Sequence, residues 1–223
     1  MTGVLFDYPQ NAAFGHVLPK NKIYQHASPS HAVKELFVRQ VEQIVWQYKL
    51  APETINLKSS RAVPEIQIFY ISLKTGELKH DVLSCIDQSI PFPIIFEVGY
   101  EGKIQVVAAF KRPSDADSSK WVVSAYFESD WVDPKAVGFR EELPVALDLE
   151  SLYALMIERL ILIKKRPFEA LRELVERAET IKKLEREIGL TENKMIKEKQ
   201  FNRKVSINAE LRILKQEYED LKR

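Results

Sequence analysis

Residues 65–111 show the most regular alternation of apolar side chains in the chain. In EIQIFYISLK, Ile66 and Ile68 fall on one face of an extended strand, whereas Phe69 and Ile71 fall on the other. A strand with two apolar faces is typical of a sheet that is covered on both sides. The runs PFPIIFEV and KIQVVAAFK predict two further strands, and the EG pair between them predicts a hairpin turn. These residues therefore predict the centre of a sheet.

Three helices are predicted from apolar residues that recur at spacings of three and four. They span residues 30–48, 78–88 and 149–164. Ser28 is the expected cap of the first helix, and Pro29 is expected at its first helical position. Asp148 is the expected cap of the last helix. We expect these helices to pack on the sheet.

The remaining parts of the body have weaker patterns. Residues 54–57 predict a short edge strand, and the alternation in residues 121–127 predicts a fifth strand. The first 29 residues have scattered apolar positions among Pro9, Gly15 and Pro19, so an irregular arm is expected there.

The composition changes at residue 168. From there to residue 223 the chain has fourteen lysines and arginines, twelve acidic residues and no proline. Two apolar series with three-four spacing indicate coiled-coil helices: Leu171, Leu174, Ala178, Ile181 and Ile188, and then Leu211, Leu214, Tyr218 and Leu221. Their registers do not join. The segment is therefore either an antiparallel hairpin that turns near Gly189, with Thr191 as a new cap, or one long helix with a stutter.

Length and composition narrow the class of protein. The chain has 223 residues, of which 45% are hydrophobic and 29% charged, which suits one domain of about 150 residues with an extension. The net charge of +1 gives no overall attraction to nucleic acid or to an acidic membrane. The single cysteine, Cys85, excludes an internal disulfide, and its place on an apolar helix stripe predicts a buried thiol. No apolar run approaches the ~20 residues of a membrane span, so we expect a cytoplasmic protein.

Asp87, Glu101 and Lys103 are the candidate catalytic residues. They have the residue types of nucleases in which an acidic residue precedes a Glu-x-Lys run, where carboxylates hold a metal ion and the lysine steadies a water. Such a site needs its carboxylates side by side, yet Glu101 falls in a predicted turn and Asp87 near a helix end. A metal-dependent nuclease is therefore the alternative function. The histidines are dispersed and phosphate-binding glycine motifs are absent, so no cofactor is predicted.

The C-terminal segment has two sets of candidate binding residues. The candidate nucleic-acid contacts are Lys194, Lys197, Lys199, Arg203 and Lys204, although interspersed glutamates favour a solvated helix face. The candidate contacts to a protein partner are Met195, Phe201, Leu211, Leu214, Tyr218 and Leu221. This apolar seam is too narrow to stand alone, so it needs its own second helix, the body or another chain.

Three stretches of the sequence point to a family. They are VEQIVWQYKLAPETINL (41–57), VLSCIDQSIPFPIIFEV with the later AAFK (82–111), and KQFNRKVSINAELRIL (199–214). Together they resemble the bacterial domain of unknown function 4391 family, and the resemblance covers nearly the whole chain. It implies a bacterial origin and a setting beside the helicase and DNA-methyltransferase genes of restriction-like defence systems. It supplies no active-site residue.

The sequence thus predicts an α+β fold, with a mixed sheet of about five strands packed by helices and a C-terminal extension of long helices. The predicted domains are an irregular arm (1–29), an α+β globular domain (30–166) and a helical hairpin or coiled coil (167–223). The favoured function is a non-enzymatic interaction subunit of a bacterial DNA-processing or restriction-like defence complex. Its tail would dock to a protein partner such as a helicase or DNA methyltransferase, and the seam also permits a homo-oligomer.

Overall fold

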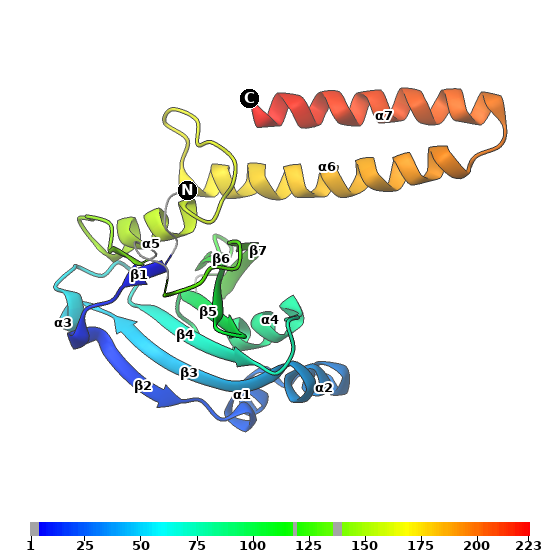
Figure 1. The fold of residues 1–223 in the computed structure, drawn as a ribbon. Helices are drawn as coiled ribbons and strands as arrows, with labels where there is room; N and C mark the ends of the chain where they lie inside the picture. The colour runs from blue at the N-terminus through cyan, green and yellow to red at the C-terminus, as the bar shows by residue number, and fades with distance from the viewer. Residues whose placement is uncertain (1–4, 118–119, 136–139) are drawn as a thin grey trace. The chain divides into compact units, whose positions relative to one another are not determined.

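A computed structural model describes residues 5–117, 120–135 and 140–223 (Figure 1). The chain divides into two compact units, Met1–Leu160 and Ile161–Arg223. The first unit contains a six-stranded sheet with helices, and the second contains a pair of long helices packed together. The fold is therefore of the predicted α+β class with a C-terminal helical extension.

The elements of the first unit are β1 (Leu5–Asp7), the 3-10 helix η1 (Gln10–Ala12), β2 (Ala13–Val17), α1 (Lys20–Ala27), α2 (His31–Gln40), β3 (Val41–Leu50), α3 (Pro52–Ile55), β4 (Ile66–Leu73), α4 (His80–Ser89), β5 (Ile94–Tyr100), β6 (Lys103–Pro113), β7 (Trp121–Glu128), β8 (Arg140–Glu142) and α5 (Leu149–Glu158). Those of the second unit are α6 (Leu171–Lys197) and α7 (Phe201–Lys222).

The main sheet has the strand order β2-β3-β4-β5-β6-β7. β4 and β5 are parallel and are connected through α4, and the other neighbouring pairs are antiparallel. β1 and β8 form a separate two-stranded parallel sheet. At the centre of the main sheet, Ile66, Ile68, Phe69 and Ile71 of β4 are all buried. The prediction that this strand is covered on both faces is confirmed.

Helices α1, α2 and α4 cover one face of the main sheet. Ile23 of α1, Phe37 of α2 and Ile86 of α4 belong to one apolar core together with Phe69 of β4. Cys85 lies in the same core as a buried free thiol, as its position on the α4 stripe predicted. Burial of this interdigitated apolar surface is the main stabilisation of the first unit.

The helix predicted over residues 30–48 is wrong in its second half. α2 ends at Gln40, and the next ten residues form β3, which pairs with both β2 and β4. Lys20 Nζ donates to the carbonyls of Phe37 (3.0 Å) and Val41 (2.5 Å), and Lys74 Nζ donates to the carbonyl of Val38 (2.8 Å). These lysines satisfy carbonyls that the end of α2 leaves open.

Two β-bulges explain why the sequence pattern misled here. The β3–β4 register shifts between Val41 and Gln43 and again between Trp46 and Tyr48. Because a bulge inserts an extra residue, buried positions such as Val41 and Ile44 are separated by three rather than by two. That spacing imitates a helix, whereas the β-branched and aromatic content of VEQIVWQYKL favours a strand.

Smaller differences occur near the N-terminus. The first 29 residues, expected to be irregular, include β1, η1, β2 and α1. Residues 54–57, predicted as an edge strand, begin in α3 and continue without strand structure. Ser28 is the left-handed C-cap of α1 with φ 47°, and Ser30 is the N-cap of α2, since its hydroxyl accepts from the Val33 amide. Pro29 therefore lies before α2.

Other predictions for the body are confirmed. The fifth predicted strand is β7, and the helix predicted over residues 78–88 is α4. Asp148 caps α5, because its carboxylate accepts a hydrogen bond of 2.7 Å from the amide of Ser151. α5 ends at Glu158, short of the predicted residue 164.

α6 and α7 run in opposite directions side by side (Figure 1). The Tyr218 hydroxyl donates to Glu185 across the pair (2.8 Å), and Lys215 pairs with Glu192 (2.7 Å). Of the two arrangements that the sequence left open, the hairpin is the one observed. Its turn is not near Gly189, however.

Gly189 and Thr191 both lie inside α6, and the chain reverses over residues 198–200. Thr191 is buried and does not cap a helix. An interior glycine costs a helix only about 0.5–1 kcal/mol, and α6 buries Leu184 before Gly189 and Thr191 after it. The helix therefore continues through the glycine.

Candidate functional site

Asp87 belongs to a buried polar cluster in the first unit. The Tyr126 hydroxyl donates to Asp87 Oδ2 at 2.5 Å, and Lys111 Nζ lies 3.4 Å from Oδ1. Lys111 Nζ also donates to the backbone carbonyls of Asp87 and Ile90, each at 2.5 Å. Every proton of this ammonium group thus has an acceptor. Lys111, which lies on β6, thus donates hydrogen bonds to carbonyls at the C-terminal end of α4 that have no partner within the helix.

Burial is the largest influence on the protonation of this cluster. It raises the pKa of Asp87 and lowers the pKa of Lys111, while the attraction between the two charges acts in the opposite direction. It also raises the pKa of Tyr126, and the neighbouring Asp87 carboxylate adds to that rise. The side chains of Asp87 and Lys111 are at most 4% exposed, so a substrate cannot reach them. The cluster ties α4 to β6 and β7.

Glu101 and Lys103 lie at the other end of β6. Glu101 and Gly102 form the tight β5–β6 turn, with φ values of 46° and 77°, as the sequence predicted. Lys103 and Lys111 are eight residues apart on β6, which corresponds to about 26 Å at about 3.3 Å per residue. The structure therefore does not bring the three candidate catalytic residues together. In the described ranges, no group of three His, Cys, Asp or Glu residues could hold a metal ion.

An ion pair between the buried Glu97 and the partly exposed Arg140 was missed from the sequence. Arg140 of β8 donates to both carboxylate oxygens of Glu97 on β5, at 3.0 and 3.3 Å, and to the Phe6 carbonyl at 2.7 Å. Burial raises the pKa of Glu97, and Arg140 opposes that rise. The pair fastens the two-stranded sheet to the main sheet. The one sequence signal was a glutamate inside the apolar run PIIFEV.

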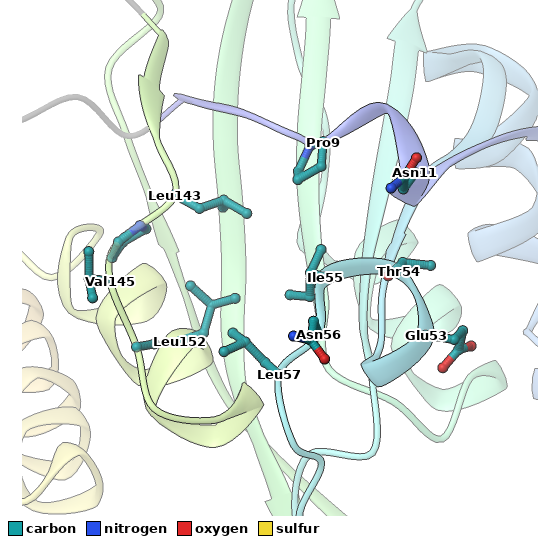
Figure 2. Close-up of a pocket in the computed structure, with 12 residues that line it drawn as sticks. Pro9, Asn11, Glu53, Thr54, Ile55, Asn56, Leu57, Leu143, Val145 and Leu152 are labelled. Atoms are coloured by element: carbon teal, nitrogen blue, oxygen red, sulfur yellow. The ribbon is translucent and has the colours of Figure 1, made fainter.

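The first unit also has an open pocket of about 560 Å³ between η1, α3 and the segment before α5 (Figure 2). Ile55, Leu143 and Leu152 extend toward this hollow (Figure 2). Among its described lining residues only Glu53 is titratable, and Glu53 forms an ion pair of 2.8 Å with Lys49. The pocket therefore offers no acid–base pair or nucleophile for catalysis.

Most of the seam predicted to bind a partner is used inside the hairpin. Leu211 is buried, and Leu214, Tyr218 and Leu221 are half-buried. These residues lie along α7, the helix that packs against α6, and the Tyr218 hydroxyl reaches Glu185 of α6. In the hairpin, this part of the predicted partner surface is therefore occupied by the chain itself.

Two arginines fasten the open end of the hairpin. The Arg177 guanidinium donates to both oxygens of Glu169, at 2.6 and 2.8 Å, and to the Leu221 carbonyl at 3.0 Å. Arg166 Nη2 donates to the carbonyls of Asp220 (3.1 Å) and Leu221 (3.2 Å). The last turn of α7 is thus capped by two cations, as the helix dipole favours. Hydrogen bonds from Arg177 hold the pKa of Glu169 at about 2.

The closed end of the hairpin exposes three large apolar side chains. Ile196, at the end of α6, is 74% exposed; Phe201, at the start of α7, is 78% exposed; and Val205 is 54% exposed. Since a helix rises about 1.5 Å per residue, all three lie within about 6 Å of a helix end along its axis. Met195, which with Phe201 was predicted to contact a partner outside the seam, is half-buried next to Ile196. We call Ile196, Phe201 and Val205 the hairpin tip.

The candidate nucleic-acid contacts surround the same tip. Lys194 and Lys197 are in the last turn of α6, Lys199 is in the turn, and Arg203 and Lys204 are in the first turn of α7, all exposed. Glu198 is the one acidic residue among them. It shapes the turn, because its carboxylate accepts from the amides of Lys199 and Gln200, and these contacts lower its pKa.

The charges in the first turn of α7 do not help the helix. Cations near a helix N-terminus oppose its dipole, typically by about 0.3–1 kcal/mol each. α7 begins with Arg203 and Lys204, has no acidic residue in its first turn, and has no side-chain hydrogen bond from its N-cap, Gln200. The exposed apolar groups likewise add nothing to the hairpin core. At the start of α7, the Glu198 carboxylate, which precedes the helix, is the anion that offsets these cations.

The described helices include none with the length and apolar content required to cross a bilayer.

Comparison with known proteins gives one result. No curated protein and no solved structure matches the chain. A family model described as "Domain of unknown function (DUF4391)" matches residues 6–217. The chain thus belongs to this family, as its resemblance over three stretches predicted.

Proposed function

We propose that this chain is a non-enzymatic interaction protein whose hairpin tip binds a partner protein. The observation that carries the proposal is the exposure of Ile196, Phe201 and Val205 among five cations at the end of a helical hairpin. Large side chains of this kind each contribute roughly 1.5–3 kcal/mol when they become fully buried. A complementary partner surface has an apolar centre and an acidic rim.

The composition of the tip favours a protein over a nucleic acid. Two of the three exposed apolar side chains are aliphatic, and single-stranded nucleic acids bind chiefly by stacking on aromatic rings. Phosphate contacts alone would use the five lysines and arginines but would leave Ile196 and Val205 exposed. A second copy of the chain is disfavoured as the occupant, because two tips with the same charge repel each other.

We further propose that the partner belongs to a cytoplasmic bacterial DNA-processing or restriction-like defence complex, and that it is a helicase or DNA methyltransferase. This proposal rests on the genetic setting that the resemblance in the sequence implies. In such a complex the first unit would stay with one subunit of the assembly while the hairpin reaches another. α6 has 27 residues and is therefore about 40 Å long, which is enough to span a small domain.

Site-specific photo-crosslinking tests the proposal in the native host. A photoreactive phenylalanine analogue at Phe201 is expected to capture one protein, which mass spectrometry then identifies. The matched control places the analogue at Gln216, an exposed position further along α7, and is expected to capture nothing.

The identified protein must then bind the purified chain at a defined stoichiometry. A helicase or methyltransferase would support the finer proposal, and another protein would overturn it while leaving the binding function in place. Capture of nucleic acid at Phe201, or equal capture from both positions, would contradict the proposed function itself.

A further inference from the structure

A second pocket, on the helix-covered face of the main sheet, has the properties of a small-molecule site. It has a volume of about 370 Å³ and lies between α1, β3, β4 and the segment that follows α4. Ile23, Ile90 and Phe92 provide apolar walls, together with the aromatic residues Trp46 and Phe69. The volume is within the usual range of small-molecule pockets, at its lower end. The pocket suits one ring system rather than an extended cofactor.

The aromatic wall of this pocket is held in place by the fold. Trp46 and Phe69 are stacked, with ring centroids 6.0 Å apart and an interplanar angle of 20°. The Trp46 indole N–H donates to the Tyr48 carbonyl at 3.0 Å. The ring centroids of Phe14 and Trp46 are 4.1 Å apart. Trp46 is therefore fixed by Phe14 and by the buried Phe69 before a ligand arrives, which lowers the entropy cost of binding.

The polar groups of the lining separate into two kinds. The Ser89 hydroxyl donates to the Cys85 carbonyl at 2.8 Å, and the Gln67 amide donates to Glu65. These groups serve the fold. Lys22 and His26, one turn apart on the same side of α1, are exposed and have no ionic or hydrogen-bonding partner among the described residues.

Lys20 of the same helix differs from Lys22 and His26, because its ammonium group donates hydrogen bonds to carbonyls at the end of α2. The described lining contains no aspartate or glutamate. The mouth of the pocket therefore presents nitrogen groups able to bind an anion, while its interior is aromatic and aliphatic.

We propose that this pocket binds a small planar aromatic anion, with the ring against Trp46 and Phe92 and the acid group at Lys22 and His26. A carboxylate there would gain charge-assisted hydrogen bonds at the rim and would lose little hydration. A neutral analogue would gain the apolar contacts alone, and a cationic analogue would be repelled by Lys22. The site is in the first unit and is independent of the hairpin tip, so either proposal can fail without the other.

Three isosteric probes test the inference on the full chain: 2-naphthoate, 2-naphthamide and 2-naphthylmethylammonium. Calorimetry should rank naphthoate at least fivefold tighter than naphthamide, with the cation weakest. In ¹H–¹⁵N spectra, naphthoate should shift the Trp46 indole N–H and the Ile23 amide. The double variant Lys22→Gln/His26→Gln should bind naphthoate no tighter than naphthamide, whereas Lys34→Gln, at an exposed cation on α2, should behave as the wild type.

Equal affinities for the anion and the neutral probe would overturn the proposal. So would shifts confined to other parts of the chain, or the absence of binding at millimolar concentration. Because the substituted side chains are exposed, thermal unfolding should be unchanged and a loss of binding would not reflect misfolding.

Discussion

The Glu169–Arg177 ion pair gives a quantitative test of how the hairpin is held closed. Both side chains are at most 7% exposed, and Arg177 joins Glu169 to the end of α7 through the Leu221 carbonyl. The substitution Glu169→Gln removes the charge but keeps the size of the side chain. It leaves the Arg177 guanidinium buried without its counter-ion, which typically costs 3–5 kcal/mol.

The lowered pKa of Glu169 has the same cause, the hydrogen bonds from Arg177. It falls from an ordinary value near 4.5 to about 2 in the folded state. This lowering corresponds to a stabilisation on the order of 3 kcal/mol at neutral pH. We therefore expect Glu169→Gln to lower the free energy of unfolding of the second unit by about 3 kcal/mol.

The direction of the pH effect follows from the lowered pKa. Because the folded state binds this proton more weakly than the unfolded state, the stabilisation is complete above about pH 4.5. It is lost progressively as the pH falls from about 4.5 toward 2. In Glu169→Gln this contribution to the pH dependence should be absent.

Hydrogen exchange of amides inside the hairpin, such as those of Ile181 and Leu211, measures this free energy in the full chain. The matched control is Glu173→Gln. Glu173 accepts from the Ala170 amide (2.9 Å) at an exposed position in the same helical turn, so its loss should cost less than about 1 kcal/mol. If the two variants opened with equal free energies, the proposed role of the buried pair would be refuted.

Two further predictions concern the fold. Gly189→Ala should stabilise the hairpin by about 0.5–1 kcal/mol in urea unfolding, because Gly189 lies inside α6 and an added Cβ meets nothing within 4 Å. Destabilisation by this substitution would contradict a continuous helix. Lys111→Met should destabilise the first unit by about 3–5 kcal/mol in thermal unfolding, because it leaves Asp87 buried without its cation. The control Lys103→Met, at the exposed start of β6, should change stability by less than about 0.5 kcal/mol. Equal effects of the two substitutions would show that the buried pair contributes nothing.

Local patterns predicted the centre of the fold well. β4 has two apolar faces because it is covered on both sides, and period-two alternation detects this arrangement directly. The pattern failed at β3, where two bulges changed the spacing of buried residues and made a strand look like the continuation of α2. A bulge depends on pairing with a distant strand, so it leaves no reliable mark on the strand's own sequence.

The hairpin illustrates a different limit. The seam residues Leu211, Leu214, Tyr218 and Leu221 were predicted as contacts to a partner and are buried or half-buried within the hairpin, because spacing cannot tell an intramolecular surface from an intermolecular one. Glycine and threonine suggested the wrong turn, because a helix tolerates one interior glycine at a small cost and α6 continues to Lys197. Phe201 was predicted as a partner contact and is exposed in the hairpin. The roles of Glu97 and Arg140 could not be predicted, because they depend on a contact between residues 43 positions apart in the sequence.

The affinity between the purified chain and the protein that crosslinks at Phe201 is the most direct test of the proposed function. Calorimetry would compare the wild type with Phe201→Ser and with Ile213→Ser, which removes a similarly exposed apolar side chain elsewhere on α7. Loss of a buried large side chain corresponds to roughly 1.5–3 kcal/mol, so Phe201→Ser should weaken binding at least tenfold, and Ile213→Ser should leave it unchanged. An unchanged affinity of Phe201→Ser, or an equal loss in both variants, would contradict binding through the hairpin tip.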